Sequence, residues 1–156
     1  MKYKSWLEKT RLELESYTPE EVAEEREKAL AMEAEWRQAG KFKTNEDEIM
    51  SVYACNCLEK EMLALGDYIM QHLTDPDDAW WLAESVYDYY GYYYMLVRKH
   101  DLAEKWFLNS FENNKPYPYS SCLCLAGVYA EMGDNERADH WIDLYLAYYR
   151  SEDNQL

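Results

Sequence analysis

The sequence predicts an all-α protein of about seven helices, arranged as antiparallel hairpins, and three observations support this prediction. Ala, Leu, Glu, Met and Lys fill most positions between the aromatic residues, whereas Gly and Pro number only five and four, a composition that favours helix over strand. Signals that begin or end a helix recur at short intervals, and short connections place neighbouring helices antiparallel. The second half of the chain also repeats at an interval of 35 residues, which is typical of stacked hairpins.

Two helices are predicted before residue 41. The first spans residues 3–16 and is modestly amphipathic. Thr18 then supplies an N-cap, Pro19 is favourable in a first turn, and Glu21 completes a capping box, so a second helix begins here. This helix ends at Gly40, because glycine readily adopts the left-handed conformation that follows many helices. Its apolar positions are Val22, Ala29, Leu30, Ala34 and Trp36.

A third helix is predicted to begin at Thr44 and to continue to about residue 73, because apolar residues recur at helical spacing throughout this stretch. Gly66 either bends this helix or divides it into two, and the sequence leaves both options open. Asp75 and Pro76 mark the next boundary, since they supply a cap and a first-turn proline.

Four further helices are predicted in the second half, each ending at a turn or loop. They span residues 79–97, 102–112, 119–132 and 135–149. They are separated by a turn near 98–101, a loop over 113–118 and a turn at 133–134. We therefore expect an N-terminal helical region over residues 1–76, two hairpins over 77–150 and a frayed tail over 151–156.

The internal repeat aligns when Ala103 is set against Ala138. In that register the matched pairs are Tyr90 with Leu125, Gly91 with Ala126, Tyr94 with Tyr129, and Phe107 with Ile142. Small residues recur where two helices must approach closely, and large residues recur where two helices must interlock. The two copies are therefore expected to form hairpins of the same kind.

This pattern resembles the tetratricopeptide repeat over roughly residues 84–150. The residues that carry the resemblance are Tyr87, Tyr90, Gly91, Tyr94, Ala103, Phe107 and Pro116 in the first copy, and Leu125, Ala126, Tyr129, Gly133, Asp134, Ala138 and Ile142 in the second. Two positions depart from it, because Arg98 replaces a turn glycine and Tyr145 replaces a small residue. The resemblance implies a short solenoid of stacked hairpins. Residues 18–73 match the pattern weakly, through Ala64, Tyr68 and Pro76, as a third, degenerate hairpin.

The resemblance also implies a function, since hairpins of this family bind peptides or protein segments in a groove lined by the first helix of each hairpin. The positions that correspond to this groove are Ser85, Asp88, Tyr92, Met95 and Leu96, followed by Ser120, Leu123, Gly127, Ala130 and Glu131. The predicted partner-binding residues are Ser85, Asp88, Tyr89, Tyr92, Met95, Leu123, Gly127 and Glu131. Acids and tyrosines favour a basic or aromatic-rich ligand through ion pairs and cation–π contacts.

Six tyrosines lie between residues 87 and 94. Tyr87, Tyr90 and Tyr94 share one helical face with Gly91 and are expected in the core. The other three, Tyr89, Tyr92 and Tyr93, fall off that face. They either form a recognition surface or pack against the preceding hairpin, and the sequence leaves this choice open.

The formal net charge is −15 and is spread along the chain: residues 1–80 hold 19 acids and 10 bases (−9), and residues 81–156 hold 12 and 6 (−6). Such a field repels nucleic acid and anionic lipid and attracts a basic protein surface, although the charge also serves solubility alone. No run approaches the roughly 18 apolar residues that span a bilayer, and the N-terminus lacks a secretory signal. We expect a cytoplasmic protein with no membrane contact.

No motif in the sequence indicates catalysis, a cofactor or a metal. Cys55 with Cys57, and Cys122 with Cys124, form two CxC pairs on predicted helices, where residues two apart point to nearly opposite sides. These cysteines are therefore expected to be reduced and buried, rather than to ligate zinc. The histidines, His72, His100 and His140, show no ligand spacing, and His100 is expected in a turn.

The sequence therefore predicts a non-enzymatic protein-interaction module, an adaptor or small chaperone. An alternative is an acidic inhibitor or immunity protein that blocks a basic, nucleic-acid-handling enzyme by placing carboxylates where phosphates would lie. Ionic strength separates these hypotheses, because phosphate mimicry weakens steeply with added salt.

Overall fold

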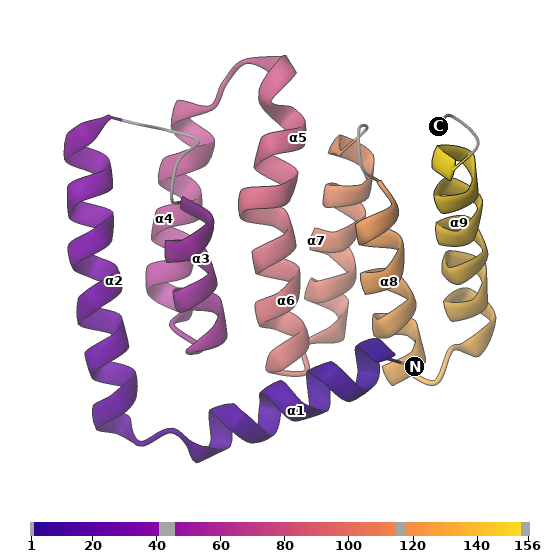
Figure 1. The fold of residues 1–156 in the computed structure, drawn as a ribbon, viewed down its shortest axis with the longest axis horizontal. Helices are drawn as coiled ribbons and strands as arrows, with labels where there is room; N and C mark the ends of the chain where they lie inside the picture. Colours follow the sequence, from indigo (N-terminus) through magenta and orange to yellow (C-terminus); the bar gives the residue numbers. More distant parts are fainter. Residues whose placement is uncertain (1, 41–45, 115–117, 154–156) are drawn as a thin grey trace.

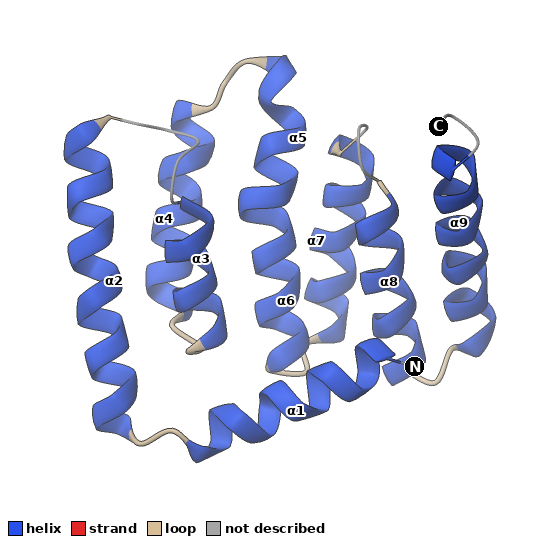
Figure 2. Ribbon diagram, viewed as in Figure 1, coloured by secondary structure: helices blue, strands red, loops and turns tan. Residues whose placement is uncertain are grey.

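The computed structural model describes residues 2–40, 46–114 and 118–153 of the 156-residue chain. Every regular element in these residues is helical, which confirms the all-α prediction (Figure 2). The elements are α1 (Lys2–Ser16), α2 (Pro19–Ala39), α3 (Glu46–Cys55), α4 (Glu59–His72), a 3₁₀ turn (Pro76–Asp78), α5 (Ala79–Leu82), a π-helical turn (Ala83–Tyr87), α6 (Asp88–Leu96), α7 (His100–Asn113), α8 (Tyr119–Glu131) and α9 (Asn135–Asp153). The predicted helix start at Thr44, residues 115–117 of the predicted loop over 113–118 and the end of the tail lie outside the described residues.

Several boundaries differ from those expected. Helix α9 continues to Asp153, so the tail that we expected to fray at residue 151 is still helical there. His100 is the first residue of α7 rather than part of a turn. Helices α5 and α6 form one continuous rod through the π-helical turn (Figure 1), as predicted for residues 79–97.

The predicted helix over 44–73 is broken, but the break does not fall at Gly66. It falls after Cys55, where Cys57 adopts a left-handed conformation with φ of 56°. Gly66 lies inside α4 for a packing reason: a Cβ there would collide with the phenol ring of Tyr90. Because the chain divides at this turn, the described residues hold eight helices when α5 and α6 are counted as one.

Three turns of the same geometry join three pairs of helices. Cys57 between α3 and α4, Arg98 between α6 and α7, and Gly133 between α8 and α9 all have positive φ, at 56°, 61° and 80°. Each donates its N–H to the carbonyl three residues back, and the next residue donates to the carbonyl five residues back, at 2.8–3.2 Å. This is the Schellman pattern of a helix C-terminus. The carbonyls five back belong to Tyr53, Tyr94 and Tyr129.

These turns fix which residues correspond among the three hairpins. The fourth residue of the second helix is Met62 in α4, Ala103 in α7 and Ala138 in α9, and all three are buried. Ala64, which we expected to match Ala103, is exposed. The first hairpin therefore stands 41 residues before the second, and Met62 rather than Ala64 occupies the equivalent place.

In Figure 1, α2 lies at one end, the overlapping helices α3 and α4 come next, and α5–α6, α7, α8 and α9 follow in chain order, while α1 runs across the lower ends of α6 and α8. One continuous core joins the hairpins; its largest fully buried side chains include Tyr53, Met62, Leu65, Tyr90, Met95, Phe107 and Leu125. Gly91 lets α6 approach α7, because a Cβ on Gly91 would lie 2.5 Å from the Phe107 ring. None of the helices in the described ranges combines the length and the apolar character that crossing a membrane requires.

Candidate protein-binding site

Helix α1 crosses the ends of α6 and α8, and one arginine anchors it there. Arg11 donates from Nη1 to Oε1 of Glu131 at 2.7 Å and from Nη2 to Oε2 at 3.1 Å. The same guanidinium donates from Nη2 to the carbonyl of Met95, and from Nε to the carbonyl of Leu96 at 3.3 Å. These carbonyls belong to the last turn of α6, where the helix dipole is negative. Arg11 thus donates hydrogen bonds to acceptors at the end of α6 and at the end of α8.

Glu131 is the acceptor at the centre of this anchor. Besides Arg11, it bonds to Nε2 of His100 through Oε2 at 2.7 Å. Burial acts to raise the pKa of Glu131, but the hydrogen bonds from Arg11 and His100 outweigh it, so the pKa lies below its ordinary value. Glu131 is therefore an ionised, fully engaged carboxylate at neutral pH.

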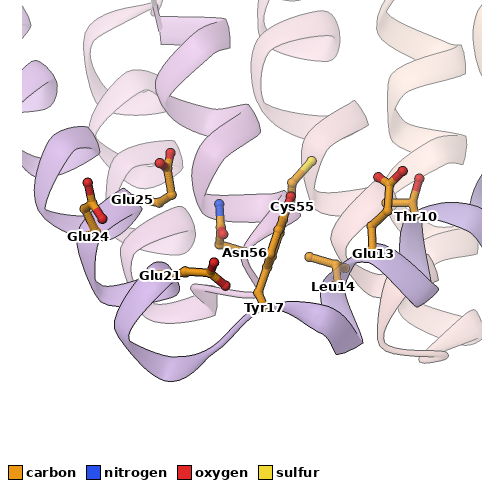
Figure 3. A pocket seen from close by; sticks show the side chains of 9 residues that line it. All are labelled: Thr10, Glu13, Leu14, Tyr17, Glu21, Glu24, Glu25, Cys55 and Asn56. Atoms are coloured by element: carbon orange, nitrogen blue, oxygen red, sulfur yellow. The ribbon is translucent and has the colours of Figure 1, made fainter.

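An acidic cleft of about 480 Å³ lies between α1, α2 and the end of α3 (Figure 3). Its lining residues are Thr10, Glu13, Leu14, Tyr17, Glu21, Glu24, Glu25, Cys55 and Asn56. In Figure 3 the carboxylates of Glu24 and Glu25 lie on one side, that of Glu13 lies on the other, and the ring of Tyr17 stands between them. Four carboxylates thus surround a surface that also offers an aromatic ring and a leucine. We call this surface the acidic cleft.

The corner between α1 and α2 builds the acidic cleft, and local sequence explains it. Thr18 accepts from the N–H of Glu21 at 3.2 Å, and the carboxylate of Glu21 accepts from the N–H of Thr18 at 2.8 Å. Pro19 occupies the first turn of α2. This capping box was predicted from the sequence, and it starts α2 at a fixed place, with only Tyr17 and Thr18 between the two helices.

Neighbouring lysines only partly neutralise the acidic cleft. Lys28 lies 3.2 Å from Glu24 and 3.4 Å from Glu25, and Lys9 lies 3.8 Å from Glu13. Both lysines are exposed, so these pairs are screened by solvent. With four carboxylates and two lysines the excess is negative. The geometry is suited to a guanidinium or ammonium group whose apolar neighbours contact Leu14 and Tyr17.

The eight residues that the sequence predicts as partner-binding do not form one open surface. Ser85, Met95 and Gly127 are buried, and Ser85 donates its hydroxyl to the carbonyl of Trp81 at 2.7 Å. Glu131 is held by Arg11 and His100. The remaining four are partly exposed: Asp88, Tyr89, Tyr92 and Leu123. Only these four remain accessible enough to contact a ligand along α6 and α8.

The tyrosine cluster is divided between the core and the surface. Tyr90 and Tyr94 are buried, as expected, whereas Tyr87 is only half-buried against Trp106. Among the three tyrosines whose role was left open, Tyr93 is buried and donates to Glu59 at 3.0 Å. Tyr92 accepts from the thiol of Cys124 at 3.7 Å, and its ring lies edge-on to Phe107. Tyr93 therefore serves packing, whereas Tyr92 both packs against its neighbours and keeps a partly exposed side chain.

Sequence reasoning missed both Arg11 and the acidic cleft. A signal for Arg11 was present, since Leu7, Arg11 and Leu14 recur at helical spacing and so share one face of α1. An arginine centred between two leucines on the inward face indicates a buried partner. The acidic cleft had no such signal, because it arises from the angle between α1 and α2 rather than from either helix alone.

The four cysteines differ in exposure, whereas all four were expected to be buried. Cys122 and Cys124 are buried in α8, but Cys57 is exposed in a turn rather than within a helix. The four cysteines form no disulfide. Within the described ranges no three His, Cys, Asp or Glu side chains are grouped so that they could hold a metal ion.

Comparisons of the chain with models of known protein families, with curated proteins and with solved structures find no match.

Proposed function

We propose that this protein is a non-enzymatic interaction module, an adaptor or small chaperone, that binds a basic segment of a partner protein in the acidic cleft. The observation that carries the proposal is the convergence of Glu13 from α1 with Glu21, Glu24 and Glu25 from α2 around a cleft of about 480 Å³. Leu14 and Tyr17 supply an apolar contact in the same place. A segment with Lys or Arg beside an apolar or aromatic residue matches both features.

The scaffold that we propose is a short solenoid of three tetratricopeptide-like hairpins: α3–α4, α5–α7 and α8–α9. Three Schellman turns with the same hydrogen bonds support it, as does a tyrosine at the same place before each turn. The burial of Met62, Ala103 and Ala138 at matching positions supports a common register. In this arrangement α2 packs on the first hairpin through α3, and α1 crosses the ends of α6 and α8.

Electrostatics would contribute mainly to the rate and selectivity of this binding. Each exposed ion pair contributes only about 0.5 kcal/mol, so the acidic cleft needs several such pairs together with its apolar contacts. The net charge of −15 accelerates the encounter with a cationic segment and disfavours acidic competitors. Affinity should therefore fall moderately as salt is added, because the apolar contacts are not screened.

A direct test uses two fluorescein-labelled probes, a peptide of alternating Lys and Leu and its counterpart with Glu in place of Lys. We expect the lysine peptide alone to bind. The variant Glu24→Gln/Glu25→Gln should weaken that binding by about fivefold, since two exposed ion pairs are lost.

The matched control is Glu27→Gln/Glu35→Gln, which removes the same charge from exposed positions of α2 that do not line the acidic cleft. Equal loss in the two variants would mean that only net charge attracts the peptide, and the proposed site would be wrong.

A further inference from the structure

Arg11 is held by groups from α6, α7 and α8 that together satisfy its guanidinium. Both carboxylate oxygens of Glu131 accept from the guanidinium, two carbonyls at the end of α6 accept from its other N–H groups, and His100 supports the carboxylate. We propose that this is a recognition site for an arginine-bearing amphipathic helix of a partner protein. In the isolated chain, α1 occupies this site as a self-bound segment that such a helix displaces.

The chemistry of the partner helix is indicated by α1 itself. Leu7 and Arg11 are buried, and Leu14 packs against the core, so the contacting stripe runs at spacings of four and three residues. Between these positions α1 faces solvent, with Leu12 67% exposed. This is the pattern of a helix laid in a groove. A partner therefore needs an arginine with apolar residues four positions before it and three positions after it.

Arginine is required rather than lysine, because the acceptors are arranged for a planar fork. Glu131 takes two parallel N–H bonds, while the carbonyls of Met95 and Leu96 take Nη2 and Nε from the edge. A lysine ammonium donates from a single point and cannot satisfy both carboxylate oxygens and both carbonyls in this geometry. The site thus discriminates between the two basic residues.

Displacement is favoured because few side chains are buried in the part of α1 whose side chains are described, residues 7–16. Helix α1 reaches α2 only through Tyr17 and Thr18, both exposed, and its buried side chains among those described are Leu7 and Arg11. Releasing α1 breaks the bonds between Arg11 and Glu131 but also opens the Glu131 carboxylate to water, which costs less than leaving it buried and unpaired. An incoming arginine restores those bonds, so the exchange loses no polar contact. Segments with few buried contacts open at low free energy.

This inference goes beyond the acidic cleft: α1 contributes Glu13 and Leu14 to the cleft and Arg11 to the arginine site, but the groups that each site presents on the hairpins and on α2 are different. The arginine site uses Glu131 and the end of α6, whereas cation binding in the acidic cleft uses the glutamates of α2. The variant Glu24→Gln/Glu25→Gln should leave the arginine site intact. Failure of either site can therefore be recognised separately.

The test uses a fluorescein-labelled synthetic peptide with the sequence of residues 1–17, titrated into the full chain. Because α1 competes from within the same molecule, the wild-type chain should bind the peptide weakly. The variant Arg11→Ala empties the site and should bind it at least tenfold more tightly. Lys9→Ala is the matched control, since it removes one exposed positive charge from the same helix and should bind like the wild type.

Changes in the peptide and in the site complete the design. A peptide with Lys at its eleventh position should bind the Arg11→Ala chain at least fivefold more weakly than the arginine peptide, and a peptide with Ala there should not bind detectably. Glu131→Gln in the Arg11→Ala chain should remove most of the binding. If Arg11→Ala gains no affinity over Lys9→Ala, α1 is a fixed part of the fold and the inference is wrong.

Hydrogen exchange of the wild-type chain tests the opening of α1 without any substitution. Amides of α1 should exchange much faster than those of α6 and α8, because α1 opens without global unfolding. Exchange of α1 at the same slow rate as the core would overturn the proposal. So would a concentration-dependent dimer of the wild-type chain that the free peptide dissociates, because the occupant would then be α1 of a second copy.

Discussion

Arg11 in α1 and Glu131 in α8 form a two-pronged ion pair across 120 positions of sequence, with both side chains only 9% exposed. The pair connects the first helix to the last hairpin. Few interactions in the described chain reach so far along the sequence. It therefore couples the position of α1, and with it one wall of the acidic cleft, to the hairpins that α1 crosses.

This ion pair should contribute strongly to stability. Arg11→Ala leaves a buried carboxylate without its main partner, so we expect the free energy of unfolding to fall by about 3 kcal/mol. Arg26→Ala is the comparison, because Arg26 forms an equally short 2.7 Å pair with Glu61 but is 45% exposed. That loss should be much smaller, because solvent screens the exposed pair. Urea titrations of both variants decide the matter, and similar losses would mean that Arg11 is solvated.

The same pair predicts a pH dependence. The pKa of Glu131 in the folded chain lies below its ordinary value of 4.5, so its stabilising effect is fully present above about pH 4.5. That effect is lost as the pH falls through the lowered folded-state pKa. The wild type should therefore exceed Glu131→Gln in unfolding free energy at pH 7, and the difference should shrink between pH 4.5 and pH 3. A constant difference over this range would show that the charge of Glu131 plays no part.

The three Schellman turns predict opposite effects for glycine and alanine. Arg98 holds φ of 61°, a conformation costing a non-glycine residue about 1–2 kcal/mol, so Arg98→Gly should stabilise by about 0.5 kcal/mol after the entropy cost of glycine. Gly133→Ala should destabilise by about 1 kcal/mol, since φ there is 80°. Lys99→Gly is the control and should destabilise, because Lys99 has φ of −92°. In thermal unfolding, the midpoint of Arg98→Gly should lie above that of the wild type, and the midpoints of Gly133→Ala and Lys99→Gly should lie below it.

The close approach of Gly91 and Phe107 predicts that a second substitution recovers stability lost through the first. Gly91→Ala places a Cβ 2.5 Å from the buried Phe107 ring and should cost about 2 kcal/mol. At the corresponding positions of the next hairpin, Ala126 is larger than Gly91, and Ile142 is smaller than Phe107. Adding Phe107→Ile should therefore recover at least half of that loss. A double-mutant cycle measures it, and additive losses would contradict the packing described.

Helix positions and turn chemistry were predictable because they depend on neighbouring residues. The capping box at Thr18, the end at Gly40 and the turn at Gly133 were all recognisable from residue type alone. The break at Cys57 was not, because a cysteine in the left-handed conformation gives no local signal. Its position is determined by the packing of α3 and α4 against α6, where Tyr90 meets Gly66.

The functional surface was harder to predict than the fold. Asp88 and Tyr92 were placed correctly on the first helix of a hairpin, but whether they are exposed depends on neighbouring helices that the repeat pattern does not specify. Met95 shows the difficulty, because a groove position in the resemblance proved to be fully buried in the core. The acidic cleft depends on the angle between α1 and α2, to which the anchoring of Arg11, the burial of Leu7 and the capping box at Thr18 all contribute.

Chemical-shift mapping of the ¹⁵N-labelled chain with the alternating Lys–Leu peptide tests the proposed function most directly. We predict that the largest shifts fall on residues lining the acidic cleft, among them Leu14, Tyr17, Glu24 and Asn56, and that they disappear with the Glu–Leu peptide. Shifts centred instead on α7 and α9, or no shifts at saturating peptide, would contradict the assignment of the acidic cleft as the binding site.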